Sequence, residues 1–152
     1  MKNQLLTSLM VLFTLITVTA TAQSNVAIKS KVFDNFPSIV QCSNAELNQI
    51  FVSVKGKQVA ASFSNTLKFS GDVISNTIKY NKLHSITMKL PAYNNAIFSL
   101  TRRLDENNQM IYVGHIFNQN SSDGYQLKRS KNNTYQFEKI KLEEILTDCA
   151  HQ

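Results

Sequence analysis

The sequence predicts an α+β domain in which one N-terminal amphipathic helix, at about 44–55, packs on a curled antiparallel meander or partly closed β-barrel of about seven strands. Three observations predict this fold class. A helix-capping motif precedes a stripe of apolar residues with helical spacing. Every later segment is short and alternates between apolar and polar residues. The connections between these segments are too short to hold the crossover helix that parallel strands require.

The first 22 residues have the features of a secretory signal peptide. Lys2 supplies a positive start, 5–18 is apolar, and Ala20-Thr21-Ala22 is a small-residue cleavage site. The apolar stretch of about fourteen residues is shorter than the roughly 20 that a membrane-spanning helix needs. We expect cleavage after Ala22, a single α+β domain over 23–152 without a transmembrane segment, and a secreted or periplasmic location in a bacterium.

Basic residues outnumber acidic residues. Sixteen Lys and Arg against ten Asp and Glu give a net charge of +6, and loss of Lys2 with the leader leaves +5. A basic exported protein can meet anionic glycans or lipid head groups, but such a charge more often only keeps a protein soluble. We expect the partner to be a protein, a glycan or a lipid head group, and anionic partners are among those expected. Export makes nucleic acid the least expected partner.

The segment "CSNAELNQIFVSVKG" predicts the helix. Ser43 and Glu46 match the S-x-x-E capping box, in which each side chain bonds an amide of the first turn. The apolar residues that follow recur at helical spacing: Leu47, Ile50, Phe51 and Val54. Lys55 suits the negative end of the helix dipole, and Gly56 can take the left-handed conformation that ends many helices.

Seven later segments predict strands, because they are short, alternating and rich in β-branched and aromatic residues. These segments are 58–63, 67–75, 84–90, 96–104, 110–117, 125–130 and 135–142. Turn residues separate them at 64–65, 76–81, 94–95, 105–108, 118–124 and 131–133. An open sheet of this size has two edges, and a single short helix covers only one face. A curled sheet or a partly closed barrel around the helix solves both problems.

Cys42 and Cys149 are the only two cysteines. In an oxidising compartment an even pair in a small domain is most simply a disulfide, with two buried free thiols as the alternative. A loop of this size gains about 4–5 kcal/mol of stability in the chain-entropy model. The tail "LEEILTDC" favours the pairing, because a helical turn through Leu142, Ile145 and Leu146 would return Cys149 toward Cys42.

His115 is the one candidate for catalysis. It shares a predicted strand face with Ile111, Val113 and Phe117. We therefore consider it as an inward-facing general base or metal ligand, aided by Asp123 or His84. We favour a histidine that is hydrogen-bonded in or beside the core. The sequence has neither H-x-H nor H-E-x-x-H spacing, and we predict no metal and no cofactor.

The basic residues of the second half predict a binding surface. Its candidates are Arg102, Arg103, Lys128 and Arg129, with Tyr125 and Tyr135 beside them. Such a strand face could hold a sulfated or uronic glycan or a lipid head group. A scattered, solvated face is the alternative.

The sequence lacks the G-x-S-x-G elbow and the phosphate-binding glycine loop that mark common enzyme classes. We expect an exported, non-enzymatic binding module of the cell envelope or extracellular space. One alternative is a barrel that holds a small apolar ligand in a cavity lined by Phe63, Phe69, Phe98 and Phe117. A hydrolase that uses His115 is the less favoured alternative.

Overall fold

The computed structural model describes residues 29–80, 82–130 and 132–143. In chain order the elements are β1 Ile39–Cys42, α2 Asn44–Ile50, β2 Gln58–Phe63, β3 Leu67–Lys79, β4 Leu83–Leu90, the 3-10 helix η1 Pro91–Tyr93, β5 Ala96–Leu104, β6 Met110–Phe117, β7 Asp123–Arg129 and β8 Tyr135–Lys141. The predicted leader lies outside the described residues, as does the predicted helical tail beyond residue 143. Among the described residues, no helix has the length and apolar character needed to cross a membrane.

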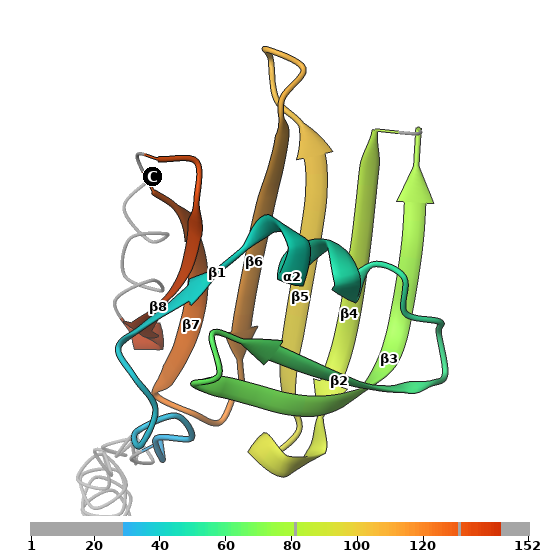
Figure 1. Ribbon diagram of the computed structural model, residues 1–152. Helices are drawn as coiled ribbons and strands as arrows, with labels where there is room; N and C mark the ends of the chain where they lie inside the picture. The colour runs from blue at the N-terminus through green and yellow to red at the C-terminus, as the bar shows by residue number, and fades with distance from the viewer. Residues whose placement is uncertain (1–28, 81, 131, 144–152) are drawn as a thin grey trace, which may run out of the picture.

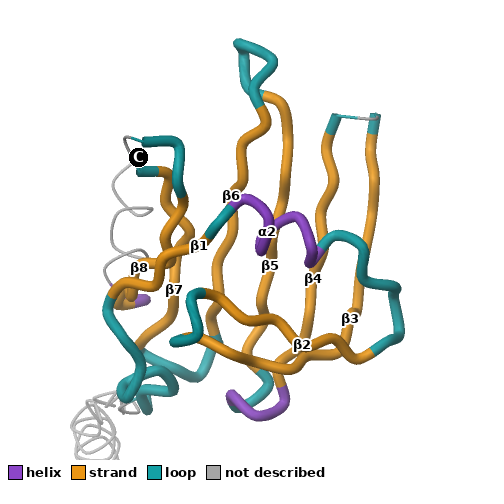
Figure 2. The backbone as a smooth tube through the Cα atoms, in the orientation of Figure 1, coloured by secondary structure: helices purple, strands orange, loops and turns teal. Residues whose placement is uncertain are grey.

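The strands form one sheet in the order β1-β8-β7-β6-β5-β4-β3-β2, and every neighbouring pair is antiparallel. The sheet curls into a half-barrel with α2 across its concave side (Figures 1 and 2). The predicted antiparallel meander is therefore confirmed from β2 to β8. Strand β1, which has four residues and pairs with β8 through Ile39 and Glu138, was not predicted from the sequence.

Helix α2 begins at the predicted capping box. The Ser43 Oγ accepts a hydrogen bond from the Glu46 amide at 3.1 Å, and the Glu46 carboxylate accepts one from the Ser43 amide at 2.7 Å. The helix ends at Ile50, however, and not near residue 55. Predicted stripe residue Val54 is 63% exposed, so its assignment to the buried face was wrong.

The helix stops early because the chain after it is held by β3. The Asn76 side-chain amide donates to the carbonyl oxygens of Phe51, at 3.2 Å, and Ser53, at 2.6 Å. Gly56 has the left-handed φ of +80° that the sequence suggested, but its amide bonds the Val73 carbonyl of β3 at 2.8 Å. It therefore shapes the entry into β2 rather than ending the helix.

The predicted turn at 76–81 was also too long, because β3 continues to Lys79. Asn76 is a strand residue that pairs with Ile86 of β4. The predicted turn at 118–124 was too long as well, because β7 begins at Asp123. The other asparagine-rich turns are confirmed by backbone conformation. Left-handed φ angles occur at Asn65, Asn94, Asn95, Asn108 and Asn133.

The core lies on the concave side, where alternate strand residues meet α2. Phe63 of β2, Phe98 of β5 and Phe137 of β8 are all fully buried. The Phe63–Phe137 ring centroids are 5.1 Å apart and the Phe98–Phe137 centroids 6.1 Å apart. Burial of one such ring stabilises the fold by roughly 1.5–3 kcal/mol. These contacts join strands from both halves of the sheet.

The two edge strands of the sheet, β1 and β2, approach each other without forming a ladder. The Ser64 hydroxyl, just after β2, donates to the Gln41 carbonyl of β1. The Glu46 carboxylate, which caps α2, also accepts a hydrogen bond from the Ser64 amide at 3.1 Å. One capping residue therefore serves both the helix and the junction of the two edges.

The segment that precedes β1 crosses the end of β7 and is held by a buried carboxylate. Asp123 is 4% exposed. Its two oxygens accept hydrogen bonds from the amides of Val32, at 2.8 Å, and Phe33, at 3.0 Å. The Ser121 hydroxyl donates to the same carboxylate at 2.6 Å.

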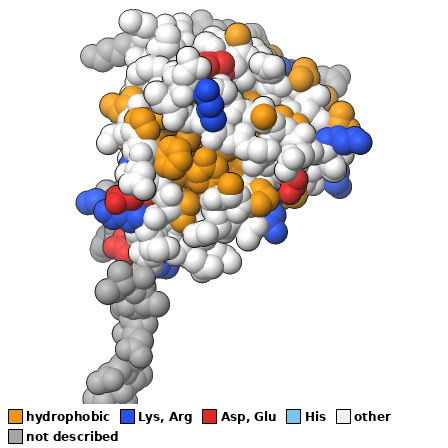
Figure 3. Space-filling model, turned by 60° about the horizontal axis from the view of Figure 1, so that its bottom comes forward, with side chains coloured by type: hydrophobic (Ala, Val, Ile, Leu, Met, Phe, Trp, Pro, Cys, Tyr) orange, Lys and Arg blue, Asp and Glu red, His pale blue; other side chains and the backbone are white. Residues whose placement is uncertain are grey.

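Aromatic rings close this end of the half-barrel. Phe33 stacks on Tyr93 of η1 at 5.6 Å and meets Tyr125 edge-on at 5.5 Å. Phe36 packs against Tyr93 at 5.6 Å, and both are only partly buried. In Figure 3, which brings this end forward, hydrophobic side chains gather near the middle of the face.

Cys42 lies at the end of β1 and is 4% exposed. Burial raises the pKa of its thiol to about 12. The side chain therefore stays protonated at neutral pH and is a weak nucleophile. Cys149 lies outside the described residues. The Cys42–Cys149 disulfide therefore stays a prediction.

Candidate functional site

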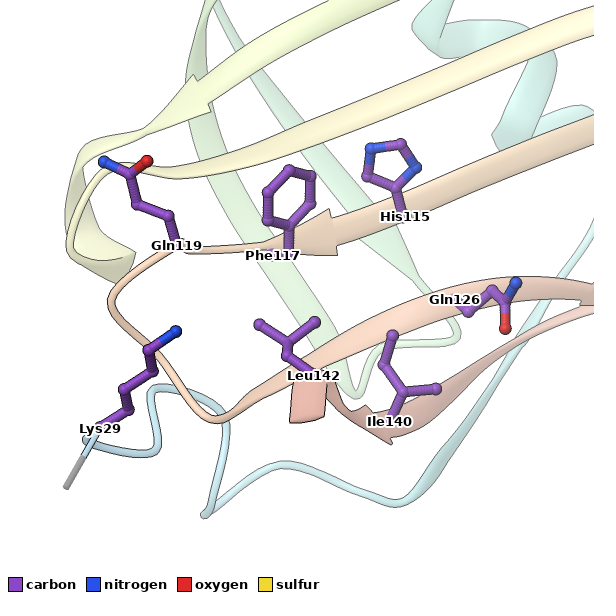
Figure 4. A pocket seen from close by; sticks show the side chains of 7 residues that line it. All are labelled: Lys29, His115, Phe117, Gln119, Gln126, Ile140 and Leu142. Atoms are coloured by element: carbon purple, nitrogen blue, oxygen red, sulfur yellow. The ribbon is translucent and has the colours of Figure 1, made fainter. Parts of the chain in front are cut away.

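A groove lies on the convex side of the sheet, over the short stretch where β6 pairs with β7. Its volume is about 500 Å³, and its lining is largely apolar. The residues that line it are Lys29, His115, Phe117, Gln119, Gln126, Ile140 and Leu142 (Figure 4). They come from the N-terminal segment, from β6, β7 and β8, and from the residues that adjoin these strands.

Local pairing explains why the groove forms. Strands β6 and β7 pair only over His115–Phe117 with Gly124–Gln126. A side chain at Gly124 would place its Cβ 2.6 Å from the Ile116 carbonyl oxygen and 3.5 Å from a Leu142 methyl group. Glycine therefore permits the close approach of the two strands and leaves the space beside Leu142 open.

His115 lies in this groove and not in the core. On β6 the inward-facing side chains are those of Tyr112 and Ile116, so His115 faces the convex side, half-buried. Its ring lies 5.1 Å from that of Phe117. Burial lowers the pKa of His115, which keeps the imidazole neutral at pH 7. The expected inward orientation was wrong, and the error arose because both faces of β6 carry large apolar residues.

The structure does not bring the predicted helpers of His115 to it. The Asp123 carboxylate is engaged by Val32, Phe33 and Ser121, and His84 lies on the concave face. Within the part of the chain that the structure describes, the imidazole of His115 has no hydrogen-bond partner. The described residues also hold no group of three His, Cys, Asp or Glu suited to a metal ion.

A second polar cluster lies on the concave side, between α2 and strands β3 to β5. Arg102 donates to the Asn48 side-chain oxygen at 3.0 Å and lies 3.1 Å from His84 Nδ1. His84 Nε2 lies 2.6 Å from the Asn76 side-chain oxygen. Because Asn76 Oδ1 and Arg102 fix one acceptor and one donor, His84 carries its proton on Nε2 and accepts at Nδ1. The Arg102 guanidinium also covers the Phe51 ring at 4.7 Å.

His84 of this cluster and His115 of the convex groove make the stability of the fold depend on pH. Burial, with a smaller effect of the Arg102 charge, lowers the pKa of His84, and burial lowers that of His115. The unfolded chain therefore binds more protons than the folded protein below about pH 6.5. We expect the free energy of unfolding to fall as the pH drops from 7 to 5, measured by urea unfolding. His84→Gln, which keeps a donor for Asn76, should flatten this dependence, and an unchanged slope would contradict the assignment.

The predicted basic surface is divided by the fold. Arg102 faces the concave side, while Arg103, next on β5, faces the convex side and is exposed. Lys128 pairs with Glu138 at 3.0 Å, and Arg129 lies 3.9 Å from Asp105. These four residues do not form one patch.

The two tyrosines predicted beside that surface are in the core. Tyr125 is 0% and Tyr135 is 2% exposed. The Tyr125 hydroxyl donates to the Pro37 carbonyl at 2.5 Å, and the Tyr135 hydroxyl accepts from the Tyr112 amide at 3.1 Å. Neither ring is available to a ligand on the outer face, so this part of the prediction was wrong.

The apolar cavity expected for a ligand-holding barrel is not formed by the four phenylalanines that defined it. Phe63, Phe69 and Phe98 pack together in the core with centroids 5.2–6.3 Å apart. Phe117 lies on the opposite face, in the convex groove.

Sequence reasoning did not assign the concave cluster to a site. Asn48 and Asn76 resemble ordinary helix-surface and turn residues, and His84 is isolated in the sequence. The only available signal was an asparagine followed eight residues later by a histidine across a hairpin.

Comparisons of the chain with protein-family models, with curated proteins and with solved structures find no match.

Proposed function

We propose that the protein is an exported, non-enzymatic binding module that holds a small amphipathic molecule of the cell envelope in its convex groove. The observation that carries this proposal is the composition of the groove. Apolar side chains of Phe117, Ile140 and Leu142 line a space of about 500 Å³, together with the neutral polar groups of His115 and Gln126. Ligand sites in proteins commonly combine an apolar lining with a few polar groups that orient the ligand.

The state of His115 favours binding over catalysis. A catalytic base is normally positioned by a hydrogen bond from a third group, and none of the described residues supplies one to His115. A neutral imidazole beside an aromatic ring suits recognition of a hydroxyl, amide or ester group of a ligand. Lys29, at one end of the groove, adds a positive charge beside the apolar lining (Figure 4).

The groove can be tested by filling it. The chain contains no tryptophan, so Gln126→Trp adds both bulk and a unique fluorophore at the groove. We expect saturable binding of the neutral apolar dye N-phenyl-1-naphthylamine by the unaltered protein, and binding about tenfold weaker or absent in Gln126→Trp. Val113→Trp is the matched control, because Val113 lies on β6, is 51% exposed and does not line the groove.

Equal dye binding by both tryptophan variants would reject the groove as the binding site, as would failure of the unaltered protein to bind the dye.

Export of the protein is tested separately, by identifying its first residue. Mass spectrometry of the protein from a secreting bacterial host should find Gln23 as the first residue, and a retained leader would contradict export.

A further inference from the structure

A second cleft lies on the concave side of the sheet, at the end that carries the β3–β4 and β5–β6 turns. Its volume is about 370 Å³. The residues that line it are Ile78, Lys82, Leu83, His84, Arg102, Leu104 and Met110. The cleft is separate from the convex groove, which faces the other side of the sheet and shares none of these residues.

Arg102 enters this cleft and forms no ion pair with any residue that the structure describes. The guanidinium is half-buried, and its partners are the neutral Asn48 and His84 side chains and the face of the Phe51 ring. The ion pairs found among the described residues join Lys31 to Asp34, Lys128 to Glu138 and Arg129 to Asp105. Among the described residues Arg102 is therefore a partly desolvated cation without a carboxylate partner, which is a costly arrangement.

The same contacts hold the guanidinium in one orientation. Asn48 fixes one terminal nitrogen, His84 contacts the other, and Phe51 supports the flat face. Two of the five N–H groups of an arginine are used in this way, so three remain to donate to a ligand. A fixed planar fork of donors is suited to an oxyanion such as a carboxylate or a sulfate.

The surroundings of Arg102 are apolar and unusually exposed. Ile78 is 64% exposed and Met110 is 46% exposed, and Leu104 lies with them in the cleft. Tyr80, in the β3–β4 turn, is 91% exposed and has a left-handed φ of 54°. Lys82 adds a second positive charge at the same end.

We propose that this cleft binds a small amphiphile, with its oxyanion on Arg102 and its apolar part against Ile78, Leu104 and Met110. This inference goes beyond the proposed function, because it concerns another face, other residues and a charged ligand. A purely structural role of Arg102, which ties α2 to the sheet, is the competing explanation. The two explanations differ in one respect: only a binding site discriminates between charged and uncharged ligands.

Calorimetric titration with three probes below their aggregation concentrations measures that discrimination. The probes are octyl sulfate, octanol and inorganic sulfate. We expect octyl sulfate to bind at least about tenfold more tightly than either of the others, because each lacks one half of the recognised group. Arg102→Gln should abolish this preference and leave the weak octanol affinity unchanged.

Arg103→Gln is the matched control, because the neighbouring arginine faces the convex side and should leave the affinity for octyl sulfate unchanged. In Gln126→Trp the preference for octyl sulfate over octanol should persist, which separates this cleft from the convex groove. If Arg102→Gln does not fold, Ile78→Glu tests whether the cleft is a binding site. Residue 78 is largely exposed, and a carboxylate there should weaken octyl sulfate binding about tenfold.

Three results would overturn the proposal. They are equal affinities of the unaltered protein for octyl sulfate and octanol, an unchanged octyl sulfate affinity in folded Arg102→Gln, and an unchanged affinity in Ile78→Glu.

Discussion

Phe137→Ala should destabilise the protein by about 3–5 kcal/mol, which is the usual cost of removing a buried aromatic ring. Phe137 is fully buried on β8 and contacts the rings of Phe63, Phe98 and Tyr125. Its loss would open a cavity where strands of both halves of the sheet meet. Because small domains have roughly 5–15 kcal/mol of total stability, a large part of the population should unfold at moderate urea concentrations.

Urea unfolding followed by far-UV circular dichroism measures this effect. Phe137→Leu, which keeps most of the apolar volume, should cost less than Phe137→Ala. Val113→Ala is the surface control and should change the free energy of unfolding by less than about 0.5 kcal/mol. A loss below about 1 kcal/mol in Phe137→Ala would show that the aromatic contacts do not hold the sheet together.

Asp123→Ala has the second largest expected effect, a loss of about 2–4 kcal/mol. The substitution removes the acceptor of the Phe33 amide and the nearer of the two acceptors of the Val32 amide, which keeps the Ser121 hydroxyl at 3.3 Å. A buried donor without a partner costs about 1–3 kcal/mol. Other contacts also hold the same segment: among them, Lys139 donates to the Phe36 carbonyl at 2.7 Å, and the Tyr125 hydroxyl donates to the Pro37 carbonyl. The segment should therefore loosen around residues 32 and 33 without leaving the sheet.

Hydrogen exchange at the amides of Val32 and Phe33 tests this local loosening, and urea unfolding tests the global loss. Asp34→Ala is the control, because the exposed Lys31–Asp34 pair belongs to a class worth about 0–1 kcal/mol. Unchanged exchange at Val32 and Phe33 in Asp123→Ala would contradict the role given to the carboxylate.

Local signals in the sequence predicted the start of the helix and the paths of seven strands. Ser43 and Glu46 act within one turn, and the alternation of apolar and polar residues depends only on the strand itself. The end of the helix was not predictable in this way. It depends on Asn76, which is distant in sequence and whose side-chain amide donates hydrogen bonds to the carbonyl oxygens of Phe51 and Ser53.

Alternation also left open which strand face is buried. His115 was assigned to the wrong side because β6 carries large apolar residues on both faces. On β7 the alternation is clear, and only the placement of Tyr125 beside the basic residues was wrong. The choice depends on partners outside the strand: Pro37 for the Tyr125 hydroxyl and Gly124 beside the convex groove. Arg102 was identified as a binding candidate from its charge alone. Its fixed orientation depends on Asn48, His84 and Phe51, which only the tertiary fold brings together.

The pairing of β1 with β8 has a consequence for the order of folding. Ile39 of β1 and Glu138 of β8 are register partners. Strand β1 therefore cannot pair until about 100 further residues have been synthesised, and contacts of such long sequence separation slow folding. A growing chain can complete the β2–β7 meander from neighbours alone. Until β8 has been synthesised, β1 and the edge of β7 that β8 covers stay unpaired. An incomplete chain therefore exposes backbone groups that favour aggregation.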